Sequence, residues 1–132
     1  MATAQQNEAQ AREAYAAFAA GDLDKVKTVF HPDIVWHVAG SSPVARDYMG
    51  IDDVLGFFGT VFTETNGTFT NTLNDIIAND TTVVAIGQVH AERKGKVIDA
   101  EQVAVYRHDA EGKVIEATFY SDDTTRFDAF FS

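Results

Sequence analysis

The segment "AYAAFAAGDLDKVKTVFHPDIVWHVAG", residues 14–40, predicts two helices and a β-strand in close succession. Apolar residues with the helical spacing i, i+3, i+4 and i+7 begin just before this segment and continue into it, at Ala11, Ala14, Tyr15 and Phe18. Gly21 suits the position after a helix, and Asp22 suits the N-cap of a second helix that stops at "HPD". A strand, "DIVWHV", follows at once.

The rest of the chain extends this pattern. A third helix is expected from about Ile51, with Asp52 and Asp53 in its first turn. From residue 67 onward apolar residues alternate with polar ones, and turn signals divide this region into four strands, at 68–78, 81–93, 96–108 and 112–122. Helices segregated from an antiparallel meander indicate an α+β fold in one domain, 1–132. The C-terminal segment is expected to pack its phenylalanines over the sheet or its neighbour.

Composition excludes several classes of function. The chain has 20 acidic and 10 basic residues, a formal charge of -10, which disfavours phosphate backbones and anionic membranes as partners. It has no cysteine, so disulfides, thiolate nucleophiles and cysteine-based zinc sites are excluded. The four histidines show no ligand spacing, and no metal or cofactor is expected. The N-terminus lacks a signal-peptide pattern, which predicts a cytoplasmic protein.

The order of elements and several local strings resemble the SnoaL-like and ketosteroid isomerase-like branch of the nuclear transport factor 2-like superfamily. The matching strings are residues 14–40, "DYMGIDDVLGFF" at 47–58, and the strand pair around "EGKV". The resemblance covers nearly the whole chain. It implies a cone-shaped α+β barrel, with three N-terminal helices packed on a strongly curved, mainly antiparallel sheet around a small-molecule cavity.

The resemblance also shows which catalytic groups differ. Steroid isomerases of this family use a carboxylate base, a tyrosine and a protonated aspartic acid, an arrangement that is a known worked example of pKa tuning. The base position falls on His37 or on Val38, depending on the anchor chosen for the alignment. The second acid falls on Ala104, and the tyrosine on Ala14, one position from Tyr15. A ketosteroid isomerase is therefore not expected.

Trp36 and His37 raise the central question of the sequence. Neighbouring residues on a strand point to opposite faces, so only one of them can face the cavity. An inward His37 would be a general base for chemistry beside a carbonyl, since its pKa is near neutrality. An inward Trp36 would be a flat apolar wall, or plain core packing, with His37 on the outer face.

Other residues complete the candidate site. Asp122 is a second candidate base or a solvated turn carboxylate, and Tyr15 and Tyr48 are candidate hydrogen-bond donors to an oxyanion. Gln102 is a candidate polar partner in the cavity. The remaining candidate ligand-binding residues are aromatic and comprise Trp36, Phe57, Phe58, Phe62 and Tyr120.

Two functions remain open from the sequence. One is a cofactor-independent isomerase, cyclase or dehydratase acting on an apolar carbonyl compound, with His37 or Asp122 as base. The other is a non-catalytic module that binds a small apolar ligand or a protein. In either case the resemblance implies a homodimer through the sheet, and the apolar outer positions Val103 and Val105 agree with that.

Overall fold

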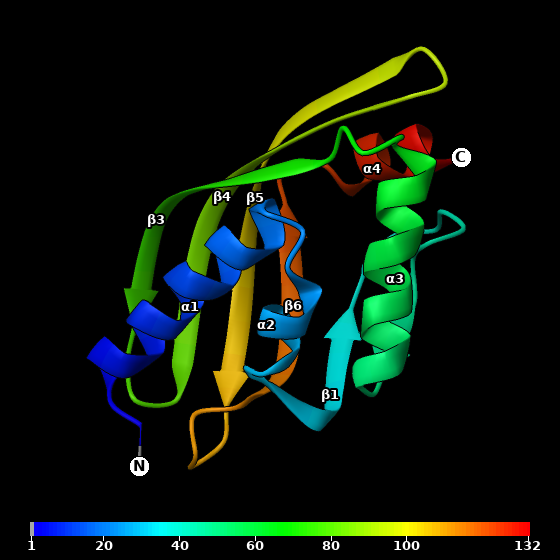
Figure 1. Cartoon of the computed structure of the whole chain (residues 1–132). Helices are drawn as coiled ribbons and strands as arrows, with labels where there is room; N and C mark the ends of the chain where they lie inside the picture. Colours follow the sequence, from blue (N-terminus) through cyan, green and yellow to red (C-terminus); the bar gives the residue numbers. More distant parts are fainter. Residues whose placement is uncertain (1) are drawn as a thin grey trace.

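The computed structural model describes residues 2–132 and contains four helices and six strands (Figure 1). The helices are α1 (Ala4–Ala19), α2 (Leu23–Lys27), α3 (Ile51–Glu64) and α4 (Thr124–Phe131). The strands are β1 (Phe30–His37), β2 (Asp47–Met49), β3 (Thr70–Ala78), β4 (Thr82–Arg93), β5 (Lys96–His108) and β6 (Val114–Ser121). The three expected helices, the strand between the second and the third, and the four-strand meander are confirmed.

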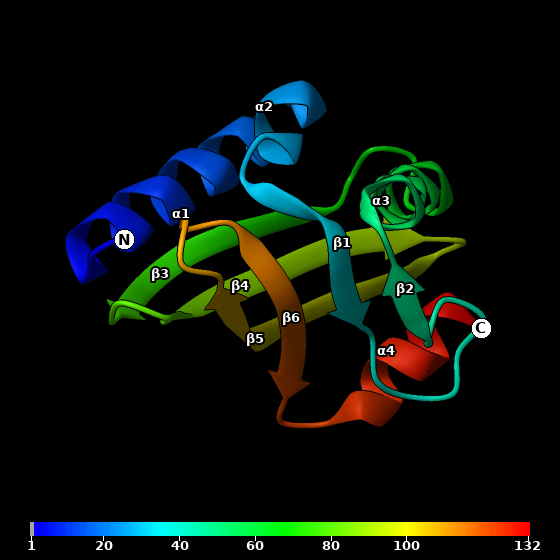
Figure 2. The ribbon, with the colours of Figure 1, turned by 90° about the horizontal axis from the view of Figure 1, so that it is seen from below.

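All six strands form one sheet in the order β2-β1-β6-β5-β4-β3. The meander from β3 to β6 is antiparallel throughout, whereas β1 runs parallel to β6 and β2 runs antiparallel to β1. The sheet is strongly curved and does not close, and helices α1, α2 and α3 lie on one side of it (Figure 2). This is the α+β cone that the sequence predicts.

Local signals explain where the first helices begin and end. Thr3 and Gln6 form a reciprocal capping box that satisfies free backbone donors at the start of α1. Gly21 takes a positive φ of 75° between α1 and α2, a conformation that costs glycine little. Asp22 then caps α2 by accepting a hydrogen bond from the Lys25 amide.

The short strand β2 lies in the segment "AGSSPVARDYMG", residues 39–50, whose small and polar residues predict a loop. Its backbone pairs with the end of β1, and Asp53 in the first turn of α3 accepts a hydrogen bond from the Met49 amide. The same carboxylate binds both terminal nitrogens of Arg46 at 3.0 Å. A three-residue strand held by such contacts has no period-two pattern long enough to be recognised in the sequence.

Two clusters of buried side chains make up the core. The larger cluster lies between the sheet and the first three helices and includes Ile34, Trp36, Val54 and Phe58. The second joins α4 to α3 and to strands β4 and β5, and there Phe130 and Phe131 are buried, as expected for the C-terminal segment. No helix within residues 2–132 is both long and apolar enough to span a bilayer.

Candidate functional site

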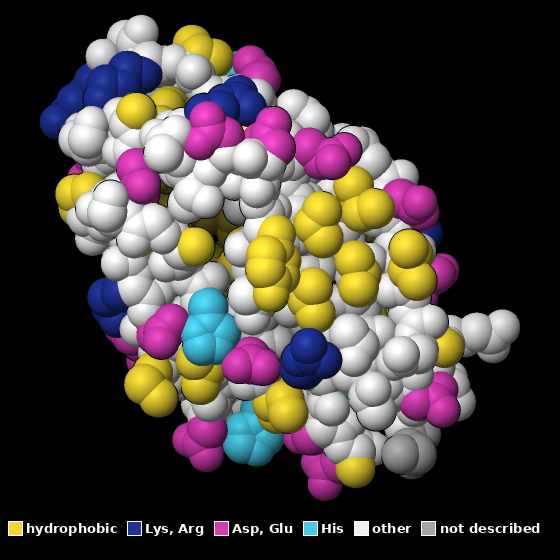
Figure 3. Space-filling view, turned by 180° about the vertical axis from the view of Figure 1, so that it is seen from behind, with side chains coloured by type: hydrophobic (Ala, Val, Ile, Leu, Met, Phe, Trp, Pro, Cys, Tyr) yellow, Lys and Arg dark blue, Asp and Glu magenta, His cyan; other side chains and the backbone are white. Residues whose placement is uncertain are grey.

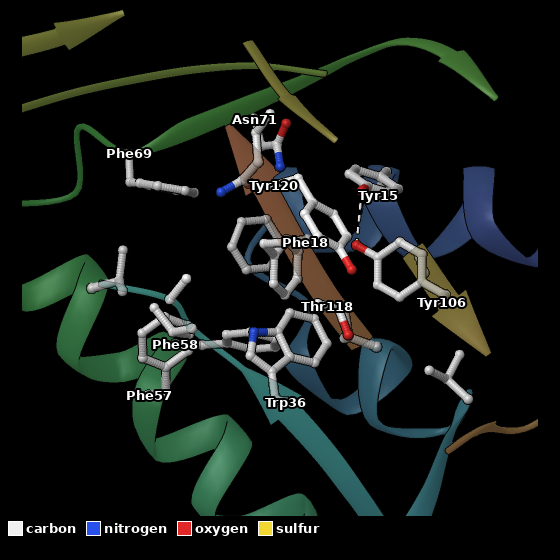
Figure 4. Close-up of a pocket in the computed structure, with 18 of the residues that line it drawn as sticks. Tyr15, Phe18, Trp36, Phe57, Phe58, Phe69, Asn71, Tyr106, Thr118 and Tyr120 are labelled. Carbon is white, nitrogen blue, oxygen red and sulfur yellow. Dashed lines mark hydrogen bonds between the residues drawn. The ribbon is translucent and has the colours of Figure 1, made fainter. Parts of the chain in front are cut away.

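A cavity of about 340 Å³ lies between the concave face of the sheet and the helices (Figure 4). A volume of this size is typical of small-molecule sites. Its walls are aromatic and include Phe18, Trp36, Phe57, Phe58, Phe69 and Phe119. Polar groups also line it, namely Gln10, Tyr15, Ser42, Asn71, Gln102, Tyr106, His108, Thr118, Tyr120, Ser121 and Thr124.

Trp36 faces the cavity. It is 7% exposed, and its ring packs against Phe119, Phe58 and Phe30 at centroid distances of 4.8, 5.1 and 5.6 Å. Val38, two residues further along, lines the same cavity because alternate residues of a strand share a face. Of the two positions that the resemblance allows for the family's catalytic base, the inward one thus holds a valine.

His37 lies on the opposite face of the sheet and does not line the cavity. Its Nδ1 lies 2.6 Å from an Asp47 oxygen, and its Nε2 lies 2.9 Å from a Glu116 oxygen. These two hydrogen bonds raise the pKa of His37, because they favour the protonated ring. Of the two alternatives that the sequence left open, the structure therefore has Trp36 facing the cavity and His37 on the outer face, so His37 is not placed to act as a base there.

Two tyrosines meet at one end of the cavity. The hydroxyls of Tyr15 on α1 and Tyr106 on β5 lie 2.8 Å apart and share a hydrogen bond (Figure 4). Burial raises the pKa of both groups, that of Tyr106 well above its ordinary value, so both are neutral phenols at physiological pH. We call Tyr15 and Tyr106 the tyrosine pair. The sequence singled out Tyr15, but nothing in it predicts the contact with Tyr106.

His108 is an ionisable cavity residue that sequence reasoning missed. It lies on β5 two residues beyond Tyr106, on the same face, and its Nδ1 is buried with no hydrogen-bond partner among the described residues. Burial lowers the pKa of His108, so the ring is neutral near pH 7. The signal was available, because His108 continues the period-two face of Gln102, Ala104 and Tyr106.

The other predicted site residues divide into two groups. Phe57, Phe58, Gln102 and Tyr120 line the cavity together with Trp36 and Tyr15. The others do not. Phe62 packs against Phe18 in the core, and Tyr48 is buried with its hydroxyl donating to the Val44 carbonyl.

Asp122 does not line the cavity either. Its side chain is 74% exposed, and one carboxylate oxygen lies 3.7 Å from an Arg126 nitrogen. The position after the last strand therefore holds the solvated turn carboxylate that the sequence left open as an alternative. The catalytic candidates Asp122 and His37 thus both lie outside the cavity.

The cavity is electrically neutral. Within residues 2–132, no aspartate, glutamate, lysine or arginine lines it. Nor do three histidine or carboxylate side chains of that range come together as a metal site. Figure 3 shows the sheet face away from α1, with a hollow whose floor is hydrophobic and with histidine and acidic side chains on the surrounding surface. Charge within the described range is therefore kept out of the cavity lining.

The SnoaL-like domain model matches residues 11–117. The chain belongs to the SnoaL-like family. An uncharacterized protein of Mycobacterium tuberculosis and one of Mycobacterium bovis are each 35% identical to it over 113 residues, covering 84% of this chain and 86% of theirs.

Solved structures agree with this assignment. Bal32a, from a soil-derived mobile gene cassette, is 32% identical and superposes with a TM-score of 0.94 over 98% of both chains. TerC, which was co-crystallized with polyporic acid, superposes with a TM-score of 0.82 at 20% identity, covering 95% of this chain and 97% of its own. The SnoaL-like fold is thus shown by sequence and by structure.

Proposed function

We propose that this SnoaL-like protein binds a small, neutral, flat and largely apolar molecule in the cavity, with an oxygen of the ligand at the tyrosine pair. The observation that carries the proposal is the aromatic cavity of about 340 Å³ that no charged side chain of the described range lines. Burying an ionised ligand there would leave its charge without a partner, at a cost of several kcal/mol. A neutral ring system gains instead from contact with the aromatic walls.

The tyrosine pair would fix the orientation of the ligand in the cavity. The two hydroxyls are bonded to each other, so one hydroxyl proton remains free for a ligand oxygen. A carbonyl or phenol placed there accepts this proton while its ring packs against Trp36. The co-crystallisation of TerC with polyporic acid is consistent with a ligand-binding role for this fold.

Trp36 makes the proposal testable, since it is the one tryptophan of the chain and lines the cavity. Titration with para-hydroxystilbene should change its fluorescence, and calorimetry should give the affinity. Tyr106→Phe should weaken binding by roughly tenfold, the equivalent of one hydrogen bond. Tyr48→Phe is the matched control, because it removes a buried hydroxyl outside the cavity. Absence of binding by flat neutral probes of this kind would overturn the proposal.

A second candidate is catalysis of proton transfer beside a carbonyl, as in an isomerase, cyclase or dehydratase. The neutral His108 ring favours it, because its buried Nδ1, which has no partner among the described residues, can accept a proton while a tyrosine hydroxyl stabilises the enolate oxygen. Proton NMR of 2-tetralone in deuterated water would test it. Wild type should accelerate exchange next to the carbonyl and His108→Gln should not, and equal rates for the two proteins would contradict this role.

We also infer that two copies associate through the outer face of the sheet. Ile77 is 61% exposed, and the partly exposed Val103 and Val105 lie on the same face. Figure 3 shows hydrophobic side chains gathered there. Exposed apolar patches of this kind favour association. Sedimentation should show a dimer that Val103→Lys dissociates and the control Met49→Lys leaves intact. A monomeric wild type would contradict the inference.

A further inference from the structure

A second group of polar side chains lies inside the cavity, away from the tyrosine pair. Asn71 on β3, Gln102 on β5 and Ser121 on β6 all line the cavity. Gln102 pairs directly with Gly87 of β4 on one side and with Ser121 on the other. The three side chains therefore form a band across four neighbouring strands, which we call the amide band.

Asn71 is the unusual member of this band. Its Oδ1 is buried and has no hydrogen-bond partner among the described residues. The amide lies over Gly87, where a Cβ would come within 2.4 Å of that oxygen. A glycine in the interior of a strand carries a cost, but here it makes room for a polar group that the folded chain does not satisfy. An unsatisfied buried amide also costs free energy, which indicates a role other than stability.

The amide band and the tyrosine pair lie at separate ends of the cavity. Gln102 and Tyr106 are four residues apart on β5, which places their backbones about 13 Å from each other. The wall between them includes Trp36 and Phe119, whose rings pack together. The cavity thus has polar groups at two ends and an aromatic middle.

We propose that the amide band is a second polar subsite, and that the ligand is an elongated flat molecule with an oxygen at each end. This rests on the proposed function, because the first oxygen is the one bound by the tyrosine pair. The second is a hydroxyl, which donates to the Asn71 amide oxygen once the amide turns toward it and accepts from an amide N–H of Asn71 or Gln102. Ligands with one oxygen leave Asn71 unsatisfied.

Two probes of the same shape test this subsite, para-hydroxystilbene and para,para′-dihydroxystilbene. With wild-type protein, calorimetry should show the diol binding roughly tenfold more tightly than the mono-ol, as one additional hydrogen bond predicts. Equal affinities would overturn the second subsite while leaving the proposed function intact. If neither probe binds, the proposed function fails, and the second subsite fails with it.

Variants of Asn71 and Gln102 test whether the amide band causes the preference for the diol. Asn71→Leu, of similar shape, should bind mono-ol and diol equally and should unfold at the same or a higher urea concentration than wild type, because an unsatisfied amide is gone. Asn74→Leu, at an exposed position of the same strand, is the control and should keep the preference for the diol. A tenfold preference that survives in Asn71→Leu and in Gln102→Leu would overturn the proposal.

Discussion

The two faces of strand β1 carry opposite kinds of side chain. On the inner face, Trp36 packs among aromatic rings beside neutral hydroxyl and amide groups. On the outer face, the next residue, His37, lies between two carboxylates. Outer-face ion pairs recur on the meander, where His90 lies 2.7 Å from an Asp99 oxygen.

The difference shows how a chain of charge -10 keeps a neutral cavity. Alternation along each strand sends most charged side chains to the outer face, where water solvates them, and it lines the cavity with apolar or neutral groups. Arg93 is an inner-face exception at the end of β4, where it is buried and paired with Glu64 of α3 at 3.0 Å, outside the cavity. The pKa values of the two histidines on opposite faces are also shifted in opposite directions. Carboxylates raise the pKa of His37, whereas burial lowers that of His108.

The inner face should be the more sensitive to truncation. Trp36→Ala removes the ring at the centre of the aromatic cluster and should lower the free energy of unfolding by about 3–5 kcal/mol. Urea unfolding must be followed by circular dichroism, since this variant has no tryptophan. Met49→Ala, at a site 68% exposed, should change stability by less than about 0.5 kcal/mol. Similar losses for both variants would show that the inner face is not the structural core.

Alanine substitutions at two glycines, one on the inner face of the sheet and one on the surface of α3, should have opposite effects on stability. Gly87→Ala places a methyl group against the Asn71 side chain and the Thr72 carbonyl on the inner face, and should cost about 1–3 kcal/mol. It should also weaken diol binding by displacing the amide. Gly59→Ala, in open space on α3, should instead stabilise by about 0.5–1 kcal/mol. Thermal unfolding measures both, and a neutral Gly87→Ala would mean that Asn71 moves aside freely.

The outer face should show the smallest effect, and a pH-dependent one. The raised pKa of His37 means that its ion pairs stabilise the fold fully below the ordinary value of about 6.5 and lose this effect as pH rises through the folded-state pKa. His37→Gln should therefore cost about 0.5–1 kcal/mol near pH 6 and less near pH 9.

Urea unfolding at the two pH values measures this difference, and a cost independent of pH would contradict it. His37→Gln should also leave the affinity for para-hydroxystilbene unchanged, since the ring lies outside the cavity. NMR titration should place the pKa of His37 above that of His108. A higher pKa for His108 than for His37 would contradict the assignment of the protonated histidine to the outer face and the neutral one to the cavity.

Much of the fold could be predicted from the sequence because it depends on local signals. Helix ends at Gly21 and Asp22, the change to period two after residue 67 and the turn strings of the meander are all short-range patterns. Strand β2 and the parallel pairing of β1 with β6 could not be predicted in this way. They depend on contacts between residues far apart in the chain, such as His37 with Glu116.

The candidate site depends even more on contacts that local sequence patterns do not predict. From the sequence alone the chain could be described as acidic, cysteine-free and α+β, with a resemblance to the SnoaL-like family and an aromatic interior. The sequence also determined that Trp36 and His37 lie on opposite faces of one strand. Which of the two faces lies inside follows from the packing of the folded chain, because a shift of one residue exchanges every side chain of a strand between core and solvent. That choice also brings Tyr15 to Tyr106, and Asn71 to Gly87.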